Sequence, residues 1–143
     1  KFADELFKAQ GVGINIKQTN ANNAYIRFKD VYSSGDFFAH AVIPETTEWM
    51  GPYKTPPKNP KRPSYIVIEM NQRTLDMKGM GDFQRTYAAG HEIGHTLGAA
   101  HPELCKDNTS VGLMNAGNFT EIKSRTFNTP MLYDKNVIKQ LYQ

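Results

Sequence analysis

The stretch HEIGHTLGAAH, which runs from His91 to His101, carries the strongest structural signal in the chain. Residues four apart lie on the same face of an α-helix, so a helix here would point the imidazoles of His91 and His95 at one position. His101 lies too far along a straight helix to join them. Gly98 is typical of a helix C-terminus because glycine accepts a left-handed backbone, and a reversal there would return His101 to the same position. The stretch therefore predicts three converging histidines.

Three imidazoles with one position left open are typical of a catalytic zinc site. Cobalt, nickel or copper could replace zinc in such a set of nitrogen ligands. Glu92 lies about 100° around the helix from His91, which places its carboxylate beside the metal rather than on it. A carboxylate there can take a proton from a zinc-activated water. We therefore expect one catalytic Zn²⁺ ion with Glu92 as the general base.

The residues before this stretch predict that the helix is a long one. Its pattern covers residues 83–97, and Asp82 is a suitable N-cap. Phe83, Tyr87 and Leu97 are available for its buried side.

On both sides of this helix, the sequence predicts a mixture of strands and helices. Alternating or β-branched runs predict four strands, at residues 12–16, 25–28, 37–43 and 64–70. Apolar spacing predicts two further helices, at residues 1–10 and from Pro130 to the C-terminus. Two stretches are expected to be irregular, at residues 46–63 and 99–129.

Composition restricts the class of protein. The 143 residues fit one domain, and 39% apolar residues are enough for a core. No stretch approaches the ~20 apolar residues of a membrane span. The basic residues of the Pro-rich segment 51–63 are interpreted as a solvated loop, so nucleic acid is not an expected partner. The single Cys105 excludes an internal disulfide. The chain starts at Lys1 without a signal-peptide pattern, so we expect a processed product and leave open a pro-segment upstream.

The pattern HExxHxxGxxH resembles that of the metzincin zinc endopeptidases. That family has a methionine turn beneath the metal, and Met114 in Gly112-Leu113-Met114-Asn115 is similar to its methionine. The Met114 side chain is expected to pack under the zinc ligands without binding the ion.

Within the metzincins, the chain is most similar to a compact matrixin catalytic domain. Residues 38–41 (Phe-Ala-His-Ala) resemble the matrixin edge strand beside the cleft, and residues 25–28 resemble the second strand. Residues 134–142 resemble the C-terminal helix, in which the acid matching Asp134 braces the methionine turn. The resemblance implies that the usual first strand is missing or lies upstream.

The resemblance implies a fold and an activity. The expected fold is α+β: a twisted mixed sheet with an antiparallel edge strand, an active-site helix, a methionine turn and a C-terminal helix. An N-terminal subdomain would cover residues 1–98 and a C-terminal subdomain residues 99–143. The expected activity is hydrolysis of internal peptide bonds in extended protein or peptide substrates. A secreted or extracytoplasmic monomer, made as a zymogen, is also expected.

Substrate contacts follow from the same resemblance. A peptide is expected to pair with the strand edge at residues 37–41, and the pocket wall is expected between Met114 and about Phe127. The residues expected to contact substrate are Phe37, Phe38, Ala39, Asn115, Asn118 and Phe119, and Thr120 and Phe127 are further pocket candidates.

The chain departs from the family in four ways. Pro102 stands where matrixins usually have serine and serralysins have proline. Ala116 stands where astacins and serralysins carry a zinc-binding tyrosine, so no fourth protein ligand is expected there. His40 matches one ligand of the matrixin structural zinc, but the chain has no partner histidines, so a second zinc is not expected. No glycine- and aspartate-rich loops are recognisable, and calcium is not predicted.

Two other classes of protein stay open. The chain could be a binding module with a peptidase fold that has lost catalysis, although the intact Glu92 argues against this. It could also be a zinc hydrolase that acts on a small amide.

Overall fold

The computed structural model describes residues 19–44, 48–50, 64–102 and 112–141. The helix predicted at residues 1–10, the strand predicted at 12–16 and Cys105 lie outside the described residues. Within them the fold is α+β, as predicted, with a small mixed sheet and helices. None of the helices in these ranges combines the length and the apolar character that crossing a membrane requires.

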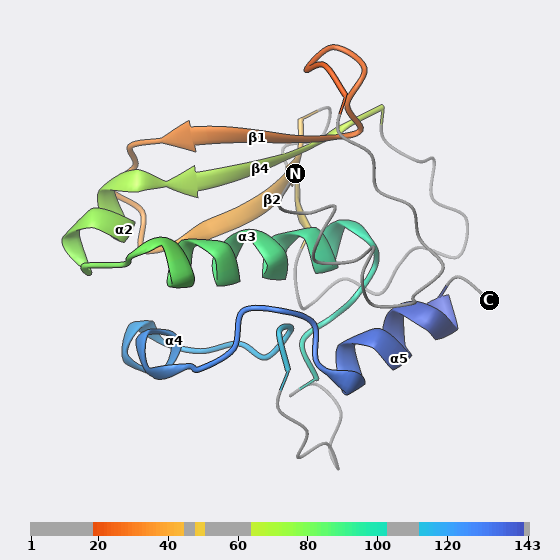
Figure 1. The fold of residues 1–143 in the computed structure, drawn as a ribbon. Coiled ribbons are helices and arrows are strands. Elements are labelled where there is room, and N and C mark those ends of the chain that lie inside the picture. The colour runs from red at the N-terminus through yellow and green to blue at the C-terminus, as the bar shows by residue number, and fades with distance from the viewer. Residues whose placement is uncertain (1–18, 45–47, 51–63, 103–111, 142–143) are drawn as a thin grey trace.

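The sheet has four strands in the order β1-β4-β2-β3 (Figure 1). Their bounds are Ile26–Val31 for β1, Ala39–Ile43 for β2, Glu48–Met50 for β3 and Ile66–Asn71 for β4. β4 runs parallel to β1 and antiparallel to β2, and β3 is antiparallel to β2. β4 lies inside the sheet, and its residues Ile66 and Ile68 are fully buried. An apolar, β-branched run is typical of a strand in this position.

The prediction that β2 forms the edge of the sheet is wrong over residues 41–43, because β3 covers that part of the strand. β3 forms within the stretch expected to be an irregular loop and pairs with residues 41–43 of β2. On its other side, β2 pairs with β4, with Ala39 opposite Met70 and His40 opposite Glu69. Ala39, at the N-terminal end of β2, lines the candidate site described below.

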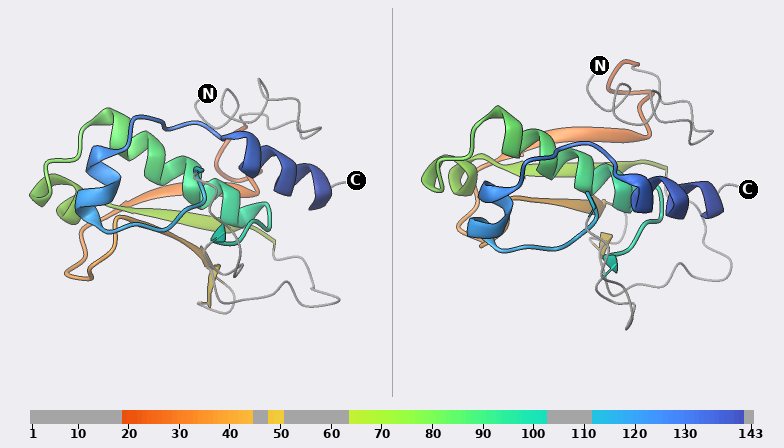
Figure 2. Two further views of the ribbon diagram at one scale, coloured as in Figure 1. Left: turned by 90° about the horizontal axis from the view of Figure 1, so that it is seen from below. Right: turned by 60° about the horizontal axis from the view of Figure 1, so that its bottom comes forward.

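In the part of the chain that the structure describes, four helices follow the strands. Their bounds are Gln72–Met77 for α2, Asp82–Thr96 for α3, Phe119–Ser124 for α4 and Leu132–Leu141 for α5. α3 packs against β2 and β4. The segment that carries α4 and α5 lies on the opposite side of α3 from the sheet, and Figure 2 shows the same arrangement from two other directions. α3 is therefore the middle layer of the described structure.

The start of α3 differs from the prediction. The N-cap is Gly81 rather than Asp82, and the Gly81 N–H donates to the side-chain oxygen of Gln84 at 3.0 Å. Asp82 lies in the first turn, where a carboxylate complements the helix dipole. Phe83 is 40% exposed, whereas Tyr87 is 2% exposed. The prediction that Phe83 is buried is wrong because the buried part of α3 begins only at Tyr87.

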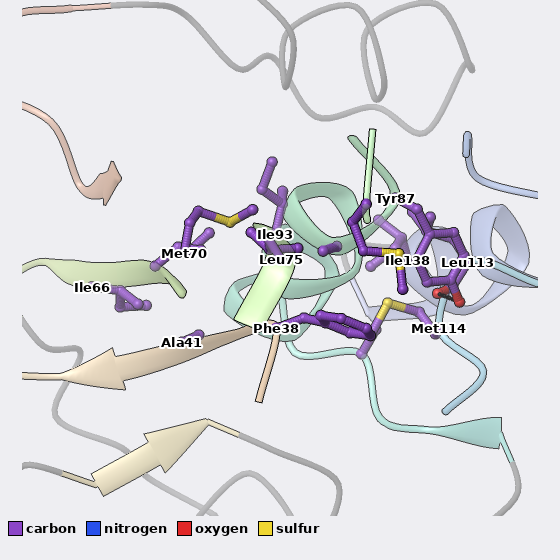
Figure 3. Packing of buried hydrophobic residues seen from close by; sticks show 14 residues of the cluster. Phe38, Ala41, Ile66, Met70, Leu75, Tyr87, Ile93, Leu113, Met114 and Ile138 are labelled. Atoms are coloured by element: carbon purple, nitrogen blue, oxygen red, sulfur yellow. Dashed lines mark hydrogen bonds between the residues drawn. The ribbon is translucent and has the colours of Figure 1, made fainter. Parts of the chain in front are cut away.

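The buried apolar residues form one cluster that links the layers (Figure 3). Ile66 and Met70 contribute from the sheet, and Ile93 contributes from α3. Leu113 and Ile138 contribute from the C-terminal segment. Burial of such side chains stabilises the fold by about 1.5–3 kcal/mol each. The core thus holds the end of α3 against the segment that follows it, and the candidate site lies at this junction.

Candidate metal centre

Three histidine side chains converge at the C-terminal end of α3. Nε2 of His91 lies 2.9 Å from Nε2 of His101, and Nε2 of His95 lies 3.1 Å from each of the other two. His91 and His95 are one turn apart on α3. Gly98 has a φ of 98°, the left-handed backbone that returns the chain toward the helix. The predicted convergence of the three histidines is therefore present, and the cluster could hold a metal ion.

The outer ring nitrogens of two histidines are held by backbone carbonyls. Nδ1 of His91 lies 2.8 Å from the Leu113 oxygen, and Nδ1 of His95 lies 2.8 Å from the Ala99 oxygen. A carbonyl oxygen only accepts, so each Nδ1 must carry the hydrogen. In a neutral ring, Nε2 then presents a lone pair toward the centre of the cluster.

Burial keeps these two rings neutral. Desolvation, together with the neighbouring imidazoles, lowers the pKa of His91 from 6.5 to about 3 and that of His95 to about 4. Two nitrogen lone pairs therefore face each other, an arrangement that a shared cation stabilises. The all-imidazole donor set fits a divalent transition metal such as zinc.

Met114 packs beneath the histidines, as expected. Its side chain is 3% exposed and lies against Gly94, which sits on α3 between His91 and His95. A Cβ added at Gly94 would collide with the Met114 sulfur and lie 3.1 Å from its methyl carbon. Glycine at position 94 therefore allows the methionine turn to approach the helix closely.

Asp134 holds the methionine turn from α5. Its carboxylate accepts hydrogen bonds from the N–H groups of Leu113 at 2.7 Å, Met114 at 3.1 Å and Met131 at 2.7 Å. The bracing role that the resemblance implied for this acid is present. The carbonyl oxygen of Leu113 accepts a hydrogen bond from His91, so Asp134 acts on the histidine cluster through the turn.

Glu92 is a buried acid beside the cluster. Its side chain is 8% exposed, and burial raises its pKa to about 8, against an opposing hydrogen bond from the Ala41 backbone. Glu92 lines the same hollow as His91 and His101. The predicted general base therefore faces the space beside the three histidines.

A hollow of about 220 Å³ opens over the histidines and Glu92. Five of the six residues expected to contact substrate line it, namely Phe37, Phe38, Ala39, Asn115 and Phe119. Asn118 does not line it, because its side chain caps α4 by accepting from the Glu121 N–H at 2.9 Å. Phe127, a further pocket candidate, packs against Tyr87 and does not line the hollow either.

Tyr87 and Arg125 hold the wall of this hollow, although the sequence did not assign either of them to the site. The Tyr87 hydroxyl lies 2.9 Å from the Leu113 oxygen and 3.0 Å from the Asn115 oxygen. Arg125 donates to the oxygens of Asn115 at 3.0 Å and Ala116 at 2.7 Å, and its guanidinium lies over the Tyr87 ring. Burial lowers the pKa of Arg125. No local motif signals this contact, since Tyr87 and Arg125 are 38 residues apart.

Two of the residues that depart from the family pattern, Ala116 and His40, are described by the structure as follows. Ala116 lines the hollow but has no donor atom in its side chain, so residue 116 supplies no fourth ligand. His40 lies 2.8 Å from the Glu69 carboxylate and stacks on Phe37. Within the described ranges, the three histidines form the only group of three or more metal-ligating side chains close enough to share an ion.

Comparison of the chain with protein-family models, with curated proteins and with solved structures finds no match. What the site can do therefore follows from its own side chains. Three converging nitrogens could hold a metal ion, and the buried carboxyl group beside them can exchange a proton with a bound water or substrate.

Proposed function

We propose that the protein is a zinc-dependent endopeptidase of the metzincin kind, most similar to a compact matrixin catalytic domain. One observation carries the proposal: His91 and His95 turn their Nε2 atoms toward His101, with Glu92 lining the space beside them. These three histidines would hold the zinc. When bound, Zn²⁺ supplies Lewis acidity, which lowers the pKa of a water toward ~7 and polarises a peptide carbonyl.

Glu92 moves the proton in this proposal. As a carboxylate it takes a proton from the attacking water and then passes it to the leaving amine of the cleaved peptide bond. Burial raises the pKa of Glu92 to about 8, and the hydrogen bond from the Ala41 backbone N–H opposes that rise by favouring the carboxylate, which is the form that acts as the base. The carbonyl oxygens of Leu113 and Ala99 orient the two helix histidines, and Asp134 fixes the turn that carries Leu113.

The N-terminal end of β2 borders the hollow over the histidines, where an extended substrate would lie. Phe37, Phe38 and Ala39 line that hollow, so a peptide bound there in extended form would hydrogen bond to this stretch main chain to main chain. Such pairing tolerates many sequences. Selectivity would then come from the hollow that Phe38 and Phe119 line next to the histidines.

Digestion of an unfolded protein, with and without a chelator, tests the proposed function. We expect cleavage at internal bonds, its loss with the chelator and its return when Zn²⁺ is added. A Glu92→Ala preparation, purified in the same way, controls for contaminating peptidases. Cleavage that the chelator leaves intact would contradict the proposal. So would hydrolysis of small amides without cleavage of any protein, which would favour the small-amide hydrolase instead.

A further inference from the structure

A second hollow adjoins the one over the histidines. It has a volume of about 520 Å³ and lies between the turn after α2 and α4. These two segments lie on the same side of the molecule (Figure 1), and the Lys123 ammonium donates to the Lys78 oxygen at 3.3 Å. Phe119 lines both hollows. A peptide that fills the hollow over the histidines and continues past Phe119 therefore reaches the second one.

The second hollow carries two ammonium groups. The Lys78 ammonium lies 4.5 Å from the centre of the Phe119 ring, and Lys123 is a further lining residue of the hollow. Neither lysine pairs with a carboxylate among the described residues. The acids on the two helices are already engaged, since Asp76 pairs with Arg85 and Glu121 caps α4. The hollow therefore presents positive charge that no described acid neutralises.

The rest of its lining suits the hydrocarbon part of an acidic side chain. Met80 and the Phe119 ring supply apolar surface, and Ser124 and Thr120 supply hydroxyl groups. A carboxylate between two ammonium groups gains charge-assisted hydrogen bonds, and its methylene groups can lie on the apolar wall. A basic side chain would meet two like charges.

We propose that Lys78 and Lys123 form a lysine subsite, which binds a carboxylate of the substrate peptide on the side of the scissile bond that passes Phe119. The carboxylate belongs to a glutamate or aspartate side chain or to the peptide C-terminus. This inference rests on the proposed peptidase function for its substrate class.

Binding of peptides to the zinc-loaded Glu92→Gln protein tests the subsite without turnover. The probes are dye-labelled apolar decapeptides with an amidated C-terminus, which differ only by glutamate or glutamine at one position, scanned along the chain. A further probe has a free C-terminal carboxylate and no acidic side chain, which distinguishes the two sources. We expect glutamate at one position to bind about 3–10-fold more tightly than glutamine, with the preference shrinking at high salt. Equal affinities for every pair and for both C-terminal forms would overturn the subsite.

Substitution of the two lysines assigns the preference to them. In the Glu92→Gln background, Lys78→Gln with Lys123→Gln should abolish the preference. Lys139→Gln, which removes an exposed charge on α5, should keep it. Lys78→Glu with Lys123→Glu should make a lysine-containing probe bind more tightly than its glutamine counterpart. A glutamate preference that persists in the double variant would overturn the assignment.

Turnover by the wild-type protein separates this inference from the proposed function. Cleavage of the glutamate and glutamine peptides at equal rates would overturn the subsite and leave the peptidase proposal standing. No cleavage of any peptide, together with lysine-dependent binding of the glutamate probes, would overturn the peptidase proposal and support the lysine subsite.

Discussion

The sulfur of Met114 lies against the backbone of Gly94, in the turn of α3 between the two helix histidines. No Cβ fits at position 94 without moving the methionine. The Leu113 oxygen accepts a hydrogen bond from His91, and Met114 is the next residue. The same turn therefore both contacts Gly94 and orients the His91 ring.

Gly94→Ala should therefore destabilise the protein. Alanine is favoured over glycine inside a helix by about 1 kcal/mol, so a loss of stability would have to come from the collision with Met114. We expect the free energy of unfolding in urea to fall by about 1–3 kcal/mol, as for other overpacked cores. The double variant Gly94→Ala/Met114→Ala removes the collision, so its loss should be smaller than the sum of the two single losses. Strict additivity would contradict the contact.

Asp134→Asn should also lower stability. The carboxylate accepts from three backbone N–H groups, whereas an amide would turn an NH₂ group toward some of them. The free energy of unfolding should fall by about 1.5–3 kcal/mol. Asp82→Asn, which changes an exposed acid in the first turn of α3, is the matched control, and a change of about 0.3–1 kcal/mol is expected there. Equal effects of the two substitutions would argue against the brace.

The parts of the site that follow from local rules could be predicted from the sequence. The pairing of His91 with His95 depends only on helix periodicity, and the return of His101 depends on the conformation of Gly98. The place of Met114 beneath them came from family resemblance. Its physical basis, the missing side chain at Gly94, becomes visible only when the turn is packed on the helix.

The parts that depend on distant neighbours could not be predicted in this way. The periodicity of α3 identifies its apolar face but not the residue at which the neighbouring elements begin to cover that face. The prediction that Phe83 is buried is wrong for this reason. α2 and α4 have six residues each, too few for a clear periodic signal. The contact of Arg125 with Tyr87 joins residues 38 positions apart, and no spacing rule connects them.

Glu92→Gln and His101→Ala should fail in different ways. Gln keeps the size of Glu92 but cannot act as a base, so turnover should fall by about 10²-fold or more with the zinc content unchanged. His101→Ala removes one of three nitrogens, so a zinc-loaded sample should lose most of its metal on dialysis. Metal analysis and peptide cleavage on the same samples measure both. Full activity of the Glu92→Gln protein would exclude Glu92 as the general base.

Arg125→Lys should loosen the wall of the hollow. Lysine keeps the charge, but it lacks the planar fork that reaches the oxygens of Asn115 and Ala116. We expect faster amide hydrogen exchange at residues 115–117 and a loss of about 1–2 kcal/mol in the free energy of unfolding. Arg73→Lys, on the exposed side of α2, should change the stability by less than about 0.5 kcal/mol. Unchanged exchange in the Arg125 variant would show that the wall does not depend on these bonds.

Without metal, the stability of the protein should depend on pH in two opposite ways. His91 and His95 have pKa values of about 3 and about 4 in the folded protein, against 6.5 as the ordinary value. The unfolded chain therefore binds more protons than the folded one between those values, and stability should rise as the pH rises toward 6.5. The pKa of Glu92 is raised to about 8 from 4.5, so its contribution is present at low pH and is lost as the pH rises through 8.

Urea unfolding in the presence of a chelator can separate these contributions. Between pH 4.5 and 6.5 the two histidines outweigh the single Glu92, and above 6.5, where the histidines of the unfolded chain lose their remaining protons, Glu92 outweighs them. A maximum of stability is therefore expected near pH 6.5, with a fall of about 1–2 kcal/mol by pH 8. In the Glu92→Gln protein, the fall above pH 6.5 should disappear while the rise below it becomes steeper. If the fall persisted in that variant, a group other than Glu92 would be responsible for it.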